Sequence, residues 1–341
     1  MKSVFNDYRQ LFGLTLVLSF LMTLPAFAQK HRMNKDISEQ YSVGQNDELE
    51  ISNKYGNVTI NTWNQREISV NVKIEAWGKN EEQVKEMLDR INIKHGKSGN
   101  TISFHTEIDS KSWSVNNNDK KGFEINYTVN MPDNNPMTLS NKYGRISMPD
   151  YKGDLKLSVA YGRASTGFLS GSRNEISVKY SGNSSFKGIT KGDLTFRYSG
   201  GAEIGKAGEI ELSDRYGSMR IDEVEKINAD IGYSSLKIGT LHQSLVLDSK
   251  YSGGKIETVK EGFKELRIDT SYGSYSVGFE SNCSFDFEIN ARYGGFKNHL
   301  EGIDMKREYV KHNSSEYSGS KGKSGKAFVK ASASYGSIEF H

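Results

Sequence analysis

Hydrophobic and polar residues alternate along most of the chain, and a tyrosine followed by glycine or serine ends each alternating run. In one unit Ile227, Ala229 and Ile231 lead up to Tyr233, and the apolar positions resume after the bend at Leu236. Such alternation is typical of a half-buried strand. Because the step across the bend is odd, apolar groups stay inside only if the chain turns a corner there. Each unit therefore predicts two short strands joined at the tyrosine.

The tyrosine returns at spacings of 17 to 21 residues between positions 143 and 293, and again near the C-terminus. The predicted corner column consists of Tyr143, Tyr161, Tyr180, Tyr198, Tyr216, Tyr233, Tyr251, Tyr272, Tyr293 and Tyr335. The pentapeptide Ser-Asn-Lys-Tyr-Gly stands both at 52–56, around Tyr55, and at 140–144. We expect the same local structure in both places.

Repeats of this length that carry two strands each are typical of a solenoid, in which successive coils stack about 4.8 Å apart. We therefore predict an all-β fold with a right-handed parallel β-solenoid of coils of about 18 residues over 137–300, the hand following from parallel crossovers. An alternative stays open. Antiparallel hairpins rolled into a sandwich also accept two-residue Gly/Ser connections.

The flanks of the repeat have their own patterns. Residues 29–136 are predicted to form a β-rich lead-in or cap with one helix near 80–91, for which Asn80 serves as the cap and Gln83 completes a capping box. The polar stretches 110–121 and 312–326 are expected to be mobile loops. Residues 301–341 are predicted to hold a loop and closing strands, with the unit at 327–341 docking as the last strands.

Residues 1–28 have the features of a cleavable signal peptide: basic residues, an apolar stretch and the small-x-small site that ends at Ala28. Gln29 follows the cleavage site, whereas a lipoprotein needs cysteine there. We expect export to the periplasm, the cell surface or the medium, without a lipid anchor. No later segment is apolar enough to span a membrane.

Composition removes several classes of function. The net charge of +3 is too small to favour a duplex nucleic acid as a partner. The single cysteine, Cys283, excludes an intrachain disulfide and a cysteine-built zinc site, and it is predicted to be a packing residue. The seven histidines form no metal-binding pair, and no nucleophile elbow, P-loop or dinucleotide fingerprint is present. We therefore expect no enzymatic activity and no cofactor.

Two charged columns accompany the tyrosines on the outward face of the predicted strands. One place before tyrosine stands a basic column, a candidate ligand-facing surface formed by Lys179, Arg197, Arg215, Lys250 and Arg292. Three places before tyrosine stand Asp230, Asp248 and Asp269. This acidic column suggests either a cation site or, more simply, neutralisation of the basic residues beside it.

The tyrosines themselves admit two interpretations. They share the parity of the apolar residues, which favours packing in the core with the hydroxyl at the rim. The alternative is a platform on which sugar rings stack.

The chain resembles the bacterial putative-adhesin family of unknown biochemical function. The resemblance rests on residues 49–60 (LEISNKYGNVTI), Trp63, the strand 68–77, the helix at 80–91 and the Tyr-Gly units. It implies an envelope or surface protein with a β-solenoid, and it brings no catalytic residues.

These observations predict a non-enzymatic, adhesin-like or structural binding module that offers an extended face to a polysaccharide or an envelope protein. Two alternatives remain. One is a β-helical carbohydrate-active enzyme, which needs a cleft beside an irregular charged cluster. The other is a periplasmic signalling or scaffold protein that binds its partner through a sheet edge.

Overall fold

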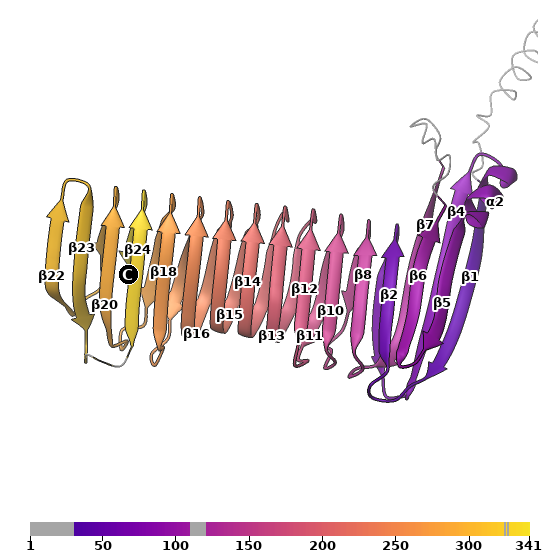
Figure 1. Cartoon of the computed structure of the whole chain (residues 1–341), viewed down its shortest axis with the longest axis horizontal. Helices are drawn as coiled ribbons and strands as arrows, with labels where there is room; N and C mark the ends of the chain where they lie inside the picture. The colour runs from indigo at the N-terminus through magenta and orange to yellow at the C-terminus, as the bar shows by residue number, and fades with distance from the viewer. Residues whose placement is uncertain (1–30, 110–120, 324, 326) are drawn as a thin grey trace, which may run out of the picture.

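The computed structural model describes residues 31–109, 121–323, 325 and 327–341. The predicted signal peptide and most of the predicted loop 110–121 lie outside these residues. The described chain is all-β apart from helix α2, so the predicted all-β class is confirmed, and its strands form one long, unclosed sheet (Figure 1). None of the helical segments described is long and apolar enough to cross a membrane.

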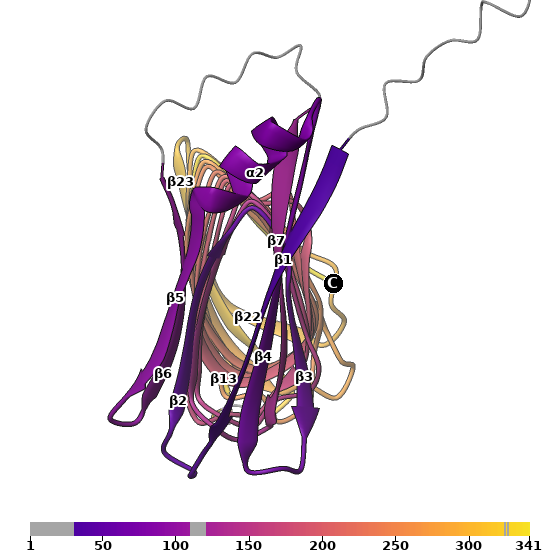
Figure 2. The ribbon, with the colours of Figure 1, turned by 90° about the vertical axis from the view of Figure 1, so that its right-hand side faces the viewer.

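Along most of its length the molecule has two layers, which Figure 2 shows from the end. Strands that lead up to a tyrosine form the first layer, and strands that follow it form the second. Strands of the first layer alone are β2 (Glu48–Lys54), β8 (Met137–Lys142), β10 (Leu155–Ala160), β12 (Asn174–Lys179), β18 (Glu265–Ser271), β20 (Phe285–Arg292) and β24 (Phe328–Ser334). Strands of the second layer alone are β3 (Val58–Trp63), β9 (Arg145–Met148), β11 (Arg163–Leu169), β17 (Gly253–Val259), β19 (Tyr275–Phe279), β21 (Gly295–Asn298) and β25 (Ser337–Phe340).

Four longer strands in the middle continue from the second layer of one coil into the first layer of the next. These are β13 (Ser184–Arg197), β14 (Ala202–Arg215), β15 (Ser218–Gly232) and β16 (Ser235–Lys250). Equivalent residues pair in parallel from coil to coil, for example Leu212 with Ala229. Consecutive coils therefore do not pair as antiparallel hairpins, and the sandwich alternative is wrong for the repeat. Inward side chains such as Leu157 and Ile176 are buried and fill the space between the layers.

The N-terminal end forms a cap on the first coils. It contains β1 (His31–Ser42), β4 (Glu67–Gly78), α2 (Glu81–Asp89), β5 (Ile91–Ser98), β6 (Thr101–Ile108) and β7 (Gly122–Pro132). The helix forms as predicted, with the Asn80 side chain accepting a hydrogen bond from the Gln83 backbone N–H at 2.9 Å. Val84, Met87 and Leu88 are its buried residues, whereas Ile91 starts β5.

Residues 48–63 form a full coil next to the one at 137–148, since β2 pairs with β8 and β3 with β9. Ser52 lies opposite Ser140, so the repeated pentapeptide builds the same structure twice, in neighbouring coils. This prediction is confirmed.

The C-terminal unit does not dock where the sequence suggested. β24 pairs with β18 on one side and β20 on the other, and β25 pairs with β19 and β21. The prediction that residues 327–341 form the last strands is therefore wrong. The physical reason is that β18 and β20 each offer a parallel sheet edge, and β24 pairs with both of them.

Most of the described part of the segment 312–326 is not the loop that its polar composition predicted. Its residues Ser314–Lys321 form β23, which pairs in antiparallel fashion with β20 and with β22 (Ile303–Lys311). The physical reason is that β20 offers a free sheet edge, whose backbone groups β23 pairs, and that the Tyr317 ring packs 5.3 Å from the Phe296 ring, measured between centroids.

Candidate functional site

A row of stacked tyrosine rings runs along the edge where the two layers meet. Neighbouring rings have centroids 4.7 to 5.1 Å apart and interplanar angles of 2° to 15°. We call this row the tyrosine ladder. In spatial order it consists of Tyr55, Tyr143, Tyr161, Tyr180, Tyr198, Tyr216, Tyr233, Tyr251, Tyr272, Tyr335 and Tyr293.

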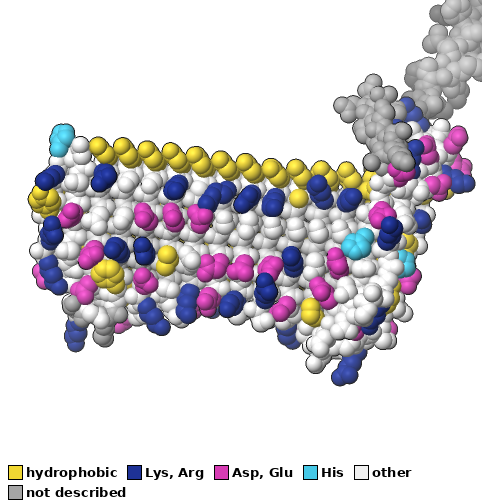
Figure 3. Space-filling view, viewed as in Figure 1, with side chains coloured by type: hydrophobic (Ala, Val, Ile, Leu, Met, Phe, Trp, Pro, Cys, Tyr) yellow, Lys and Arg dark blue, Asp and Glu magenta, His cyan; other side chains and the backbone are white. Residues whose placement is uncertain are grey.

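The ladder is exposed, so the predicted packing of these tyrosines in the core is wrong. Their exposed fractions range from 42% to 52%, and they form the hydrophobic ridge along the upper edge in Figure 3. The reason is the backbone: all eleven residues have φ between 50° and 61°. In this left-handed conformation the side chain leaves the alternating direction of the strand and points outward at the corner.

Small residues after the tyrosines let the coils approach at this corner. A Cβ added at Gly162 would lie 1.8 Å from the carbonyl oxygen of Gly144 in the preceding coil. Where serine replaces glycine, as at Ser199 and Ser252, the side chain is buried and its hydroxyl donates to the carbonyl oxygen two residues earlier. The Tyr-Gly and Tyr-Ser pairs thus define the corner and keep the rings in register.

Stacking decides which parts of the rings a ligand meets. Each ring faces its neighbours, so the faces of the inner rings are largely covered and the ladder presents ring edges and phenolic hydroxyls. A platform of open faces for sugar stacking is therefore not what the structure offers. The ladder offers instead a straight row of hydroxyls at the spacing of the strands.

The basic column lies in the first layer beside the ladder and is only partly continuous. Lys179, Arg197 and Arg215 are opposite one another in three successive strands. Gly232 takes the next place, and Lys250 follows it. Arg292 lies three coils beyond Lys250, because Ser271 and Ser334 occupy the places between them. Figure 3 shows Lys and Arg side chains in an interrupted row below the ridge.

The acidic column is in register as predicted, with Asp230 opposite Asp248 and Asp248 opposite Asp269. The Arg215 guanidinium contacts the Asp230 carboxylate and also donates to the Asp230 carbonyl oxygen at 2.7 Å. Within the described residues no three His, Cys, Asp or Glu side chains are grouped to hold a metal ion. The contact with Arg215 supports neutralisation at Asp230.

Cys283 is buried, as expected for a packing residue, and its thiol donates to the Val259 carbonyl oxygen at 3.4 Å. Burial is the main cause that raises the pKa of this thiol. A thiol in this state is a poor nucleophile at neutral pH.

Asp214 is a buried acid that sequence reasoning missed. It occupies an inward place of β14, between Phe196 and Ile231 of the neighbouring coils, and only 1% of it is exposed. Neither carboxylate oxygen has a hydrogen-bond partner of normal geometry within the described chain. Burial raises the pKa of Asp214 to about 6 and outweighs the opposing effects of the nearby Ser234 and Arg215. Its only signal in the sequence is that an acidic residue stands at a position where the alternating pattern of the strand calls for an apolar one.

A second candidate site lies at the opposite ends of the strands, where three turns of the cap meet. A cleft of about 560 Å³ is lined by residues of the turns 43–45, 63–66 and 132–135. Its volume is within the range of small-ligand sites. No sequence motif predicted this cleft, because its residues come from three separate turns.

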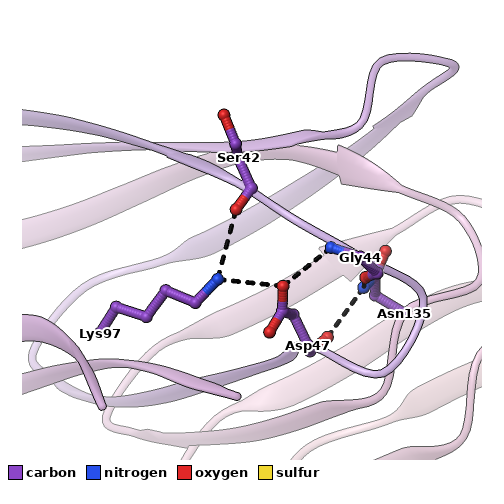
Figure 4. A network of polar contacts seen from close by, with 5 residues as sticks. All are labelled: Ser42, Gly44, Asp47, Lys97 and Asn135. Carbon is purple, nitrogen blue, oxygen red and sulfur yellow. Dashed lines mark hydrogen bonds and ion pairs between the residues drawn. The ribbon is translucent and has the colours of Figure 1, made fainter. Parts of the chain in front are cut away.

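A polar network fixes these turns (Figure 4). The Asp47 carboxylate accepts hydrogen bonds from the Gly44 backbone N–H at 2.8 Å and from Lys97 Nζ at 3.0 Å. The Asn135 amide donates to the carbonyl oxygens of Gly44 and Asp47 at 2.7 and 2.8 Å. The backbone hydrogen bond from Gly44 is the main cause that lowers the pKa of Asp47, and Lys97 adds to it. The charged form of Asp47 therefore stabilises the turn.

Comparisons with known proteins give weak structural neighbours. No family model matches the chain, and a search of curated proteins returned no match. Among solved structures, a "putative lipid binding protein" from Parabacteroides distasonis shares 12% identity over 90% of this chain and 96% of its own, with a TM-score of 0.37. A "putative adhesin" from Bacteroides fragilis shares 10% identity over 90% and 97%, with a TM-score of 0.34. A further "putative adhesin", from Parabacteroides merdae, shares 8% identity over 90% and 96%, with a TM-score of 0.35. Scores this low leave function to be argued from the residues of the chain itself.

Proposed function

We propose that this protein is an exported, non-enzymatic binding module of the bacterial envelope that holds an extended anionic polysaccharide along the tyrosine ladder. The observation that supports this proposal is the ladder itself: eleven tyrosines kept half exposed in one straight row. Large exposed side chains in an ordered row are unusual on a soluble surface and typically mark an interaction site.

The chemistry of the row suits a polymer rather than a small molecule. Each rung offers one phenolic hydroxyl, which both donates and accepts hydrogen bonds. Lys179 and Arg197 add positive charge along the same edge, and Arg215 continues the row while paired with Asp230. Contacts of this kind are individually weak, and a polymer that engages many rungs at once gains affinity through multivalency.

The proposal includes the winding of the chain and its location. The parallel pairing of coils fits a right-handed β-solenoid, since parallel crossovers are right-handed in nearly all proteins. The expected signal peptide supports a location in the periplasm, on the surface or in the medium. A rod with one repeated edge is a suitable scaffold for such a ligand, because every coil repeats the same contact.

The test is retention on polygalacturonate at low and high salt. Replacing Arg197, Arg215 and Lys250 together with glutamine should reduce retention at low salt, and retention of the parent should fall as salt rises past about 0.15 M, where charges are screened beyond about 8 Å. The matched control replaces Lys187, Lys206 and Lys255 with glutamine. These three lysines lie in the second layer on β13, β14 and β17.

The control loses the same charge and should retain most of the binding. Equal retention of the parent and the Arg197/Arg215/Lys250 variant at low salt would contradict a role for the basic column. Retention on neutral dextran as strong as on polygalacturonate would contradict the anionic class of ligand.

A further inference from the structure

The cleft in the N-terminal cap is built independently of the tyrosine ladder. Strand β2 starts at Glu48, beside the cleft, and ends at Lys54, beside Tyr55. The two sites therefore lie at opposite ends of the same strands, about 20 Å apart at the usual rise per residue. A ligand in the cleft makes no use of the ladder or of the basic column.

The walls of the cleft are rigid. Besides the bonds to Gly44 and Asp47, the Asn135 carbonyl oxygen accepts a hydrogen bond from the Tyr151 hydroxyl. The Val43 backbone N–H donates to the Arg66 carbonyl oxygen at 3.0 Å, which joins the first turn to the second. A site held in this way is preorganised, so a ligand does not have to order the turns on binding.

The polar side chains that line the cleft have unused hydrogen-bonding capacity. Those of Gln45, Asn64, Gln65 and Asn134 form no hydrogen bond with any other residue in the described ranges. Each amide offers both a donor and an acceptor. Four free amides around one cleft match a ligand with several neighbouring hydroxyl groups.

Trp63 supplies the aromatic wall. Its indole N–H donates to the Glu67 carbonyl oxygen at 2.8 Å, which fixes the ring and leaves its apolar surface for a ligand. The rest of the apolar lining is small, mainly Val43 and Pro132. One fixed aromatic ring among amides favours a sugar ring over a lipid or an apolar peptide.

The charges of the cleft favour an acidic ligand. Asp133 is paired with Lys152, whose ammonium lies 2.7 Å from its carboxylate, and this pairing raises the pKa of Lys152. Arg66 has no ionic partner among the described residues and is exposed at the rim. Its guanidinium suits a carboxylate, which it binds with two parallel hydrogen bonds.

We propose that the cleft formed by the turns 43–45, 63–66 and 132–135 is a binding site for one acidic sugar residue, a uronate or a sialate. Trp63 packs against the sugar ring, the amides of Asn64 and Gln65 bind its hydroxyls, and Arg66 pairs with its carboxylate. This site is separate from the tyrosine ladder. Different variants therefore test the cleft and the proposed polysaccharide site on the ladder.

The experiment is calorimetric titration of the protein with glucuronate, galacturonate, mannuronate, guluronate and N-acetylneuraminate, with neutral galactose for comparison. At least one acidic sugar should bind more tightly than galactose. Arg66→Gln should weaken binding of that sugar by roughly tenfold to a hundredfold, the usual loss for a charged hydrogen-bonding partner. The double variant Asn64→Ala, Gln65→Ala, which keeps Arg66, should also bind the acidic sugar more weakly than the parent does.

Folding and site specificity have their own controls. Since the side chains of Asn64, Gln65 and Arg66 form no hydrogen bond or ion pair with other residues in the described ranges, their variants should keep the urea midpoint of the parent. Arg163→Gln, on β11, and the Arg197/Arg215/Lys250 variant should both bind the sugar as the parent does. The proposal is overturned if none of the acidic sugars binds, or if binding is unchanged in both cleft variants.

Discussion

The Tyr272 ring stacks on the Tyr335 ring, with centroids 4.8 Å apart and an interplanar angle of 2°, although the coil that contains Tyr293 lies between them in the chain. Tyr293 stacks on the other side of Tyr335 at 4.7 Å. The C-terminal unit is thus inserted between two coils that are consecutive in sequence. The ladder stays continuous because the inserted unit brings its own tyrosine.

A designed disulfide can test this order of coils. The hydroxyl oxygens of Ser274 and Ser337 lie 3.1 Å apart, in neighbouring coils. In a Cys283→Ser background, cysteines at 274 and 337 should therefore form a disulfide under mild oxidation, because adjacent strands meet its geometric limits. Mass spectrometry of the peptides from a non-reducing digest would identify the bond.

The matched control places cysteines at 274 and 295. Ser337 lies between these two positions, opposite Gly295 in the register of β25 and β21. This pair should stay reduced. A disulfide between 274 and 295, and none between 274 and 337, would show that the C-terminal unit docks at the end of the array.

The close approach at the corner predicts a position-specific effect of adding one methyl group. Gly162→Ala places a Cβ 1.8 Å from a backbone carbonyl oxygen, so the coils must move apart. We expect a loss of about 1–3 kcal/mol in the free energy of unfolding, the range for overpacking. Gly182→Ala is the control, since no atom lies within 4 Å of its added Cβ. Equal urea midpoints for the two variants would contradict the close packing.

Tyr216 tests whether the ladder contributes to stability through the core or through ring stacking. Its ring lies 4.8 Å from that of Tyr198 and 5.0 Å from that of Tyr233. Tyr216→Ala should lower the free energy of unfolding by about 1–2 kcal/mol, which is the stabilisation expected from stacked aromatic pairs. Tyr216→Gly should be about 1 kcal/mol more stable than the alanine variant, because glycine adopts positive φ without strain.

The reference for this series is Leu212→Ala, a core truncation in β14, the strand that ends just before Tyr216. It should lower the free energy of unfolding by about 2–5 kcal/mol. Chemical denaturation of the three variants gives the comparison. If Tyr216→Ala lowers the free energy of unfolding as much as Leu212→Ala does, Tyr216 contributes to stability as a core residue and the stacking explanation is contradicted.

The buried acid Asp214 predicts an unusual dependence of stability on pH. Its folded-state pKa of about 6 exceeds the ordinary value of 3.8, so folding favours the protonated form. The contribution of Asp214 to stability is therefore fully present below about pH 4 and is lost as pH rises through about 6. Asp214→Asn should stabilise the protein at pH 7 by roughly 1–3 kcal/mol, a figure that follows from the shift after allowance for solvent screening.

Urea unfolding at pH 4 and pH 7 measures this effect. The gain from Asp214→Asn should vanish near pH 4, where the parent is protonated at this residue. Asp193→Asn, at an outward place of β13, is the control and should show no such gain. A variant less stable than the parent at pH 7 would mean that the charged carboxylate has a partner that stabilises it.

Much of the repeat was predictable because alternation and period are local properties. Ile227, Ala229 and Ile231 are buried, as their spacing indicates. The helix at Asn80 was predictable for the same reason, since its cap and apolar stripe are consecutive. The position of β24 was not predictable, because it depends on which of several similar edges accepts it, and that choice is made by contacts distant in sequence.

The candidate sites show where local patterns fail. Parity placed Tyr216 inside, but parity holds only while the backbone stays extended, and a positive φ reverses it. Lys179, Arg197 and Arg215 lie opposite one another, as their shared spacing from the tyrosines indicated, whereas the distance to Arg292 depends on the inserted unit. That these residues face a ligand stays a prediction. The cleft was missed because Trp63 and Arg66 line it only together with turns that are distant in the chain.

The inserted unit also sets the order of events in time. Synthesis proceeds from the N-terminus, so coils up to the one that contains Tyr272 can assemble as they emerge. The next coil to emerge, which contains Tyr293, belongs one place further on. One edge of its β20 can pair with β23, but the edge that faces β18 has no partner until residues 327–341 arrive. Until then the edge of β18 stays open. A ribosome that stalls in the last fifteen residues therefore leaves a nearly complete rod with an exposed sheet edge, on which a strand of another chain can pair.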